Sequence, residues 1–199
     1  LKKIRADIKN EKRYIEFPNP SAAVFKKYWK DYHKWNLDPY TSTDSFPDVK
    51  INLVDDVYHI EYKVYINAQP KGLPLDHVST LKNAFTFWES AILTANDGKK
   101  AFVKFYQVDI KSDANIWITW VIRNLGEGVL GHANLGKGIV EVALAGYGCD
   151  GSSQLFTVDT IETIMIHELG HSLGFEHSTE ANNIMYPSIK KVNYAYCLL

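Results

Sequence analysis

The 199-residue sequence predicts an α+β (mixed α/β) domain at residues 57–199, preceded by a helical extension and linker at residues 1–56. Two observations predict this organisation. Segments in which apolar and polar residues alternate, a pattern typical of strands, begin at Tyr58. Segments whose apolar residues recur at helical spacing precede, interrupt and follow these strands. The length suits one domain with a small appendage and is sufficient to bury a core.

The N-terminal extension contains one predicted helix, which Ser21 caps. Asn36 to Pro39 end this helix, and residues 40–56, rich in Thr, Ser, Asp and Pro, are typical of an extended connector. The apolar residues of the helix share one face, which we expect to pack on the main domain: Val24, Phe25, Tyr28, Trp29 and Tyr32.

The main domain begins with a strictly alternating strand at Tyr58–Ile66. Asp76 predicts the start of a helix whose buried face is formed by Val78, Leu81, Phe85, Trp88 and Ile92. Further strands are predicted at 101–108 and 114–121, with two short strands at 128–135 and 138–144 around a glycine-rich turn. A glycine-rich loop at 146–153 then leads to a second helix, for which Asp159 and Glu162 form a capping box.

Composition excludes several classes of partner. The 22 basic and 23 acidic residues nearly balance, so the chain has no electrostatic footprint for nucleic acid. No apolar run approaches the roughly 18–20 residues of a membrane span. The two cysteines, Cys149 and Cys197, are compatible with one disulfide or with two separate thiols, and we favour the disulfide because Cys197 lies close to the C-terminal end.

The segment HELGHSLGFEH carries the chemistry. His167 and His171 lie one helical turn apart, so both imidazoles can reach one cation, and Glu168 projects beside the open position of that cation. Gly174 allows a sharp turn out of the helix, after which His177 returns as a third ligand. Three histidines leave a fourth position for water, as in catalytic zinc sites. A buried helix that is merely rich in histidine is the alternative, but neutral histidines on one face would make a poor core.

This motif, H-E-x-x-H-x-x-G-x-x-H, resembles the signature of metzincin zinc metalloproteases. Ser178 follows the third histidine, and Met185 lies in Asn183–Pro187 (NIMYP), which is similar to the A-L-M-Y-P turn of the matrixin branch, the matrix metalloproteinases. Upstream, 128–133 (GVLGHA) is similar to the family's G-x-L-A-H-A strand, and 113–118 (DANIWI) to its A-D-I-x-I strand. The resemblance covers residues 58–188.

The resemblance implies a twisted mixed sheet, a backing helix, an active-site helix and a Met-turn. His167, His171 and His177 would bind one catalytic Zn²⁺, Glu168 would be the general base, and Met185 would form the floor below the metal. An extended peptide would pair with an edge strand and meet one pocket wall. The residues so implied in substrate binding are Leu130, Gly131, His132, Ala133, Tyr186, Pro187 and Ser188.

The sequence also departs from the family. Only His132 matches a ligand of the family's structural zinc, so we expect no structural zinc, while calcium dependence stays open. Only 14 residues follow Met185, too few for the family's long final helix, and we expect the helix at 21–35 to cover part of that surface. No cysteine precedes Cys149, which excludes the family's cysteine switch. Asp48 offers a carboxylate that could cover zinc if residues 1–56 are a pro-segment, although a plain linker is the simpler interpretation.

These observations predict a zinc-dependent endopeptidase, or metalloendopeptidase, that hydrolyses extended peptides or proteins through metal-activated water. The alternatives are a catalytically silent, metzincin-like peptide-binding protein and an aminopeptidase with a glutamate as third ligand. Glu168 argues against the first, because a binder needs no carboxylate beside the water. His177 and Met185 argue against the second. The resemblance implies a secreted or cell-surface protein, which we expect to be a monomer.

Overall fold

The computed structural model describes residues 43–67, 77–121, 129–149, 152–189, 192 and 194–197. The predicted helix at 21–35 and the predicted cap Asp76 lie outside these residues. Within them, no helix is both long and apolar enough to cross a membrane. The expected covering of the domain by the N-terminal helix therefore stays a prediction.

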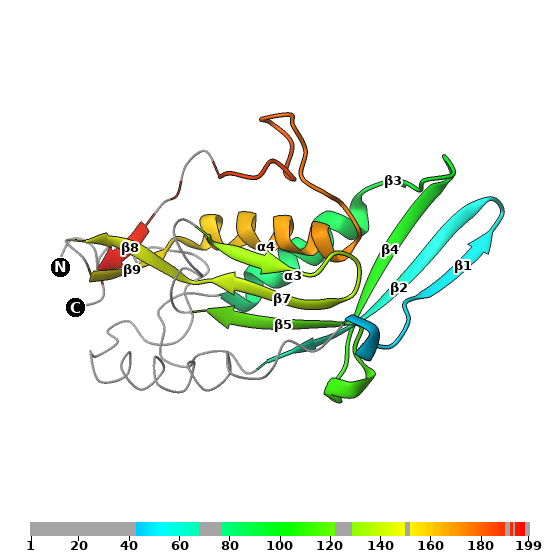
Figure 1. Ribbon diagram of the computed structural model, residues 1–199, viewed down its shortest axis with the longest axis horizontal. Coiled ribbons are helices and arrows are strands. Elements are labelled where there is room, and N and C mark those ends of the chain that lie inside the picture. The colour runs from blue at the N-terminus through cyan, green and yellow to red at the C-terminus, as the bar shows by residue number, and fades with distance from the viewer. Residues whose placement is uncertain are drawn as a thin grey trace.

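The main sheet has seven strands in the order β3-β4-β2-β5-β7-β6, with β1 paired to β2 (Figure 1). The central strands β4, β2, β5 and β7 run parallel, whereas β1, β3 and β6 pair antiparallel with their neighbours, so the predicted mixed sheet is confirmed. Strand β6 ends the order and is an edge strand. The bounds are β1 (Lys50–Val54), β2 (Val57–Ile66), β3 (Leu93–Thr94), β4 (Lys100–Gln107), β5 (Ile116–Val121), β6 (Gly131–Ala133) and β7 (Gly138–Ala143).

Two helices, α3 (His77–Ser90) and α4 (Val158–Ser172), pack against each other and against the same face of the sheet (Figure 1). Their apolar residues and those of the central strands form one core, because each strand turns alternate side chains toward the helices. The largest fully buried side chains include Leu81, Ile116, Ile118, Trp120, Leu155, Phe156, Ile161, Ile164 and Met165. This core holds α4, the helix of the histidine motif, at a fixed position beside β6 and β7.

The predicted helix face of α3 is partly confirmed. Leu81 and Trp88 are buried and Phe85 packs against the core, as predicted. Ile92 is 64% exposed because the helix ends at Ser90, before the turn that would have directed Ile92 inward. Ala84, on the same helix, is buried in the core of the domain. The side chain of Val78 lies outside the described residues.

The N-cap of α4 is Thr157, not Asp159 as the sequence predicted. The Thr157 hydroxyl accepts a hydrogen bond from the backbone N–H of Thr160, and Asp159 lies in the first turn, where its charge favours the helix dipole. Glu162 accepts a hydrogen bond from the side-chain amide of Asn83 on α3 instead of closing a capping box. Thr157 and Asp159 are both residue types that cap helices, and the extended backbone dihedrals of Thr157 identify it as the N-cap.

The predicted glycine-rich loop is wrong for the described residues of 146–153, because the residues before 150 and after 151 form paired strands. Strand β9 (Ser152–Phe156) pairs antiparallel with β8 (Ala145–Cys149) on one side and with β10 (Tyr194–Cys197) on the other. Cys149 and Cys197 therefore lie on strands that flank β9. The disulfide between them stays a prediction. Their side chains lie outside the described residues.

Part of the predicted connector is attached to the sheet. After η1 (Thr43–Ser45), Phe46 is buried against the Trp117 ring, and residues 50–54 form β1. A division at residues 56 and 57 stays a prediction, but the last part of the segment before it is bonded to the sheet. Asn115, which is 2% exposed, joins this connector to the sheet. Its amide nitrogen donates to the carbonyls of Pro47 and Asp48 in the connector. Its amide oxygen accepts from the N–H of Lys63 in β2.

We expect Asn115→Ala to lower the free energy of unfolding by roughly 2–4 kcal/mol, because it leaves three part-buried backbone groups without their partner. Urea unfolding of the variant and of the native chain measures the difference. Asn52→Ala, at an exposed position of β1, is the control and should change stability by less than about 0.5 kcal/mol. Equal losses in the two variants would contradict this role of Asn115.

Candidate metal centre

The C-terminal end of α4 turns the chain back toward its own last turn. Gly174 adopts a φ of 95°, a left-handed conformation that glycine accepts without steric cost. Its N–H donates to His171 O, and the next residue, Phe175, donates its N–H to Gly170 O, which together form a Schellman motif. The ring of Phe175 stacks on Trp88 of α3 at 5.4 Å. The predicted sharp turn at Gly174 is therefore present, and it is fixed by packing.

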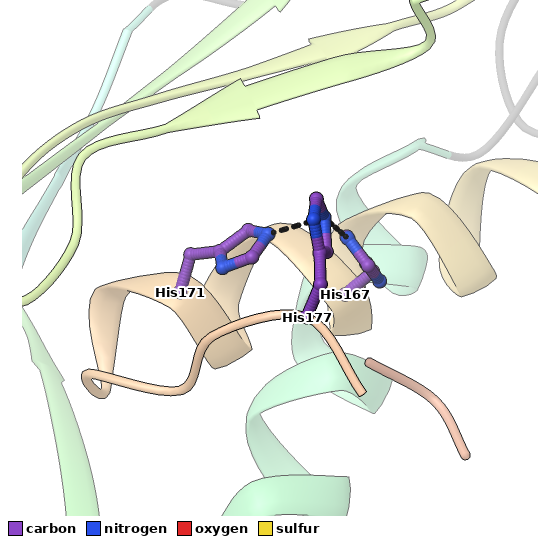
Figure 2. A group of neighbouring side chains, drawn as sticks. All are labelled: His167, His171 and His177. Atoms are coloured by element: carbon purple, nitrogen blue, oxygen red, sulfur yellow. Dashed lines mark hydrogen bonds between the residues drawn. The ribbon is translucent and has the colours of Figure 1, made fainter. Parts of the chain in front are cut away.

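Three imidazoles meet beyond this turn (Figure 2). The Nε2 atom of His177 lies 3.3 Å from Nε2 of His167 and 3.2 Å from Nε2 of His171. Tetrahedral zinc with Zn–N bonds of 2.0–2.1 Å places its ligand nitrogens about 3.3–3.4 Å apart. Among the described residues, this is the one group of three or more metal-binding side chains. The donor atoms, their type and the two spacings to His177 fit one zinc ion.

Backbone carbonyls orient two of these rings. Ile184 O lies 2.8 Å from Nδ1 of His167, and Phe175 O lies 2.7 Å from Nδ1 of His171. A carbonyl only accepts, so each Nδ1 carries the proton, and each Nε2 presents its lone pair to the shared space. Second partners of this kind fix the tautomer of metal-binding histidines.

Burial also keeps these two histidines ready to bind a cation. It lowers the pKa of His167 and of His171, and their carbonyl partners only partly oppose this effect. The neighbouring imidazoles lower both pKa values further, since a second positive charge in the group would be repelled. The neutral form, which is the form that binds zinc, is therefore favoured near neutral pH.

Glu168 lies beside the histidines and is 6% exposed. Its carboxylate packs against Gly131 of β6, where a Cβ would lie 2.6 Å from Glu168 Cδ. Burial raises the pKa of Glu168 to about 8, and the carboxylate of Glu141 adds to the rise. A divalent cation among the histidines would favour the charged carboxylate and oppose this shift.

Met185, which the resemblance assigns to the Met-turn, packs against the helix that carries the histidine motif. It is 4% exposed and packs on Gly170 of α4, where an added Cβ would overlap the Met185 sulfur and lie 2.9 Å from Trp88 Cζ2. The turn is closed by hydrogen bonds from Ser178 N–H to Met185 O and from Met185 N–H to Asn183 Oδ1. Gly170 thus allows the Met-turn to approach the helix closely.

A cleft of about 750 Å³ contains the three histidines and Glu168. The residues predicted for substrate binding line the same cleft from two sides: Leu130, Gly131, His132, Ala133, Tyr186, Pro187 and Ser188. Further lining residues were missed in the sequence: Val129, Leu135, Gly146, Phe156, Ile164, Ile189 and Val192. Phe156 and Gly146 were missed because β8 and β9 were taken for a loop. Ile164 could have been found, since it precedes His167 by three residues on α4.

A family model of the matrixins, Peptidase M10, matches residues 55–197. The chain belongs to the matrixin family. Membership implies a zinc metalloendopeptidase, and the histidine group is the part of the structure that suits such an ion.

Named matrixin relatives are distant. The chain is 27% identical over 177 residues to metalloendoproteinase 1-MMP of Arabidopsis thaliana, covering 82% of this chain and 40% of that protein. It is 30% identical over 139 residues to stromelysin-1 of Equus caballus (65% and 26%) and 30% identical over 134 residues to metalloendoproteinase 1 of Glycine max (59% and 41%). The matches span less than half the length of each relative. A solved structure of myroilysin aligns at 19% identity with a TM-score of 0.38, covering 59% of this chain and 48% of that one.

His132 and Glu141 face each other across the sheet edge. His132 of β6 is paired in register with Glu141 of β7, and its Nδ1 lies 3.9 Å from the Glu141 carboxylate. Burial raises the pKa of Glu141. The absence of a structural zinc stays a prediction. Asp48 does not lie in the histidine group; it pairs with Lys137 at 2.6 Å, which agrees with the linker interpretation.

We expect Gly170→Ala to destabilise the protein by about 1–3 kcal/mol, because the new methyl group overlaps Met185 and crowds Trp88. A double-mutant cycle with Met185→Ala measures the contact by urea unfolding. The methyl group should cost less in the Met185→Ala background, where the sulfur is gone. Simple addition of the two effects would contradict a direct contact.

We expect Glu168→Gln to stabilise the metal-free protein at pH 9 by roughly 2–4 kcal/mol and to have little effect near pH 4. The folded-state pKa of Glu168, about 8, exceeds that of an unfolded glutamate, so the folded chain binds the proton more tightly. Stability from this group is therefore present at low pH and is lost as pH rises through the folded pKa. Thermal unfolding in the presence of a chelator, at several pH values, checks this. A difference that stays constant with pH would contradict it.

Proposed function

We propose that this matrixin is a zinc-dependent endopeptidase that uses Glu168 as its general base. One observation carries the proposal: three histidine nitrogens that lie within 4.8 Å of one another share a cleft with a buried carboxylate. When bound, zinc would supply Lewis-acid chemistry, lowering the pKa of water to near 7 and polarising a peptide carbonyl. His167, His171 and His177 would hold the ion.

The chain's own carboxylate moves the proton. Glu168 takes the proton of the attacking water and delivers it to the nitrogen of the leaving amine, so the peptide bond breaks without a covalent enzyme intermediate. Its position supports this role, because the buried carboxylate lines the same cleft as the histidines that would hold the ion. The Gly131 contact holds the carboxylate between the edge strand and the histidines.

The substrate is an extended peptide or protein segment that adds a strand to β6. Strand β6 pairs with β7 on one side, and among the described strands nothing pairs with its other side. Main-chain hydrogen bonds to 130–133 would hold the peptide, and alternate side chains would enter the cleft. Tyr186, Pro187 and Ser188 would form the facing wall. His132 serves as an edge-strand residue in this scheme.

The wider assignments belong to the same proposal. Residues 57–199 form the catalytic domain, and residues 1–56 form an N-terminal extension and linker, which acts as a pro-segment if its removal raises activity. The protein acts as a secreted or cell-surface monomer with one catalytic zinc and no structural zinc. Relatives named metalloendoproteinase support the activity, although each is more than twice as long as its matched part.

We expect Glu168→Ala to bind about one zinc per chain, like the native protein, and to lose about 10³-fold or more of kcat/KM. Metal analysis measures the zinc, and a quenched-fluorescence peptide measures cleavage, with and without a chelator. Glu176→Ala is the matched control, because Glu176 lies in the same motif but is exposed. It should keep both zinc and activity.

Two outcomes would contradict the proposal. A native chain that binds no zinc overturns the metal site. A zinc-loaded native chain that cuts nothing, also after removal of the N-terminal extension, is the catalytically silent peptide-binding protein instead.

A further inference from the structure

The segment that precedes β1 is bonded to the turn that follows the substrate strand. The ammonium group of Lys137, in the turn between β6 and β7, donates to Phe46 O at 2.8 Å and to Asp48 Oδ1 at 2.6 Å. In Figure 1 the blue segment that begins with η1 lies beside the start of β5, where Asn115 binds the carbonyls of Pro47 and Asp48. We call residues 46–48 the N-terminal strap.

Burial fixes the strap in place. Phe46 is 3% exposed, and its ring lies 4.4 Å from that of Trp117. Asn115, which holds two strap carbonyls, is itself buried and accepts the N–H of Gly138 at the start of β7. The strap is therefore a rigid support at the sheet edge, and Lys137 is the side chain that links it to the turn.

The same turn reaches the active-site helix and the cleft. Gly136 donates its N–H to His171 O at 2.9 Å, one residue before Lys137. Leu135 is 53% exposed and lines the cleft directly after the substrate strand β6. Residues 134–137 thus lie between the strap on one side and the cleft on the other. A change at Lys137 would therefore alter the position of Leu135 and of β6, the parts of the turn and strand that adjoin the cleft.

We propose that Lys137 is a positioning residue for substrate binding, which it achieves by fixing the β6–β7 turn to the N-terminal strap. This inference rests on the proposed function. Among the described residues, Lys137 bonds to Phe46 and Asp48 and not to the histidines or Glu168, so it acts through the turn that follows the substrate strand. Zinc binding does not depend on it, because the Schellman motif at Gly174 and the carbonyls of Ile184 and Phe175 hold the ligands independently.

The two hydrogen bonds of Lys137 contribute unequally to holding the turn. The Asp48 side chain is 98% exposed, so water and salt screen its ion pair with Lys137. Lys137 itself is 23% exposed, and its bond to Phe46 O reaches the part of the strap whose side chain is buried. Loss of Lys137 should therefore matter more than loss of the Asp48 charge.

The test compares Lys137→Met with the native chain, both in full length and loaded with zinc. We expect KM for a long peptide to rise about three- to tenfold, the range that loss of one hydrogen bond of ordinary strength spans, while kcat and zinc content stay unchanged. Lys137→Arg, which keeps the charge and the donors, should restore KM. Asp48→Asn should change KM by less than about twofold.

Peptides shortened from either end sharpen the test. The rise in KM caused by Lys137→Met should persist for peptides shortened from one end. It should vanish for peptides shortened from the other end, which no longer reach Leu135. Lys50→Met is the matched control, because Lys50 forms an exposed ion pair with Glu61 on β1 and β2, far along the chain from the turn. It should leave KM, kcat and zinc content unchanged.

Each result decides the role of Lys137. An unchanged KM in Lys137→Met, or a fall in melting temperature and zinc content without a change in KM, assigns Lys137 to stability alone and overturns the inference. If Lys137→Met does not fold, Lys137→Gln is measured by the same criteria. The same comparison can be made without catalysis. It measures the peptide affinity of zinc-loaded Glu168→Ala and of the double variant Glu168→Ala, Lys137→Met. Absence of cleavage by the native chain overturns the proposed function, whereas equal affinities in this pair overturn only the role of Lys137.

Discussion

The left-handed turn at Gly174 is the constraint on which the metal centre depends. A helix can present His167 and His171 to one point, but no residue further along the same helix can close a tetrahedral site around that point. The turn ends α4, brings Phe175 O to His171 Nδ1, and lets His177 meet the other two rings. Phe175 stacked on Trp88 holds this turn from the side of α3. Ligand geometry is thus set by helix packing.

A second dependence is electrostatic. The site buries a carboxylate beside imidazoles that burial keeps neutral, and another carboxylate, Glu141, adds to the cost of ionising Glu168. Without a cation, burial disfavours the charged form of Glu168 near neutral pH. A divalent ion favours that charged form, so metal binding and the state of Glu168 are coupled. The residues are arranged for a bound metal more than for the empty protein.

The histidine motif could be read from the sequence because ligand spacing and glycine placement follow from local backbone geometry, whereas the Met-turn and the edge strand came from the resemblance to the matrixins. Sequence reasoning failed where the local structure depends on pairing between residues that are far apart in the sequence. Glycines at 146–151 are typical of loops, yet residues up to 149 form β8, which pairs with β9, the strand that brings Phe156 to the cleft. The contact between Lys137 and Phe46 joins residues 91 positions apart, which no periodicity reveals. Thr157 and Asp159 both suit a cap, and only the backbone dihedrals decide between them.

The central claim is that one metal ion binds the three Nε2 atoms and leaves a position open beside Glu168. Crystals of the zinc-loaded protein, with anomalous diffraction recorded at the zinc edge, test it most directly. The account predicts one strong anomalous peak about 2.0–2.1 Å from Nε2 of His167, His171 and His177, with no fourth protein ligand. A peak bound through Nδ1 atoms, a fourth protein ligand that closes the site, or no peak at these histidines would contradict it.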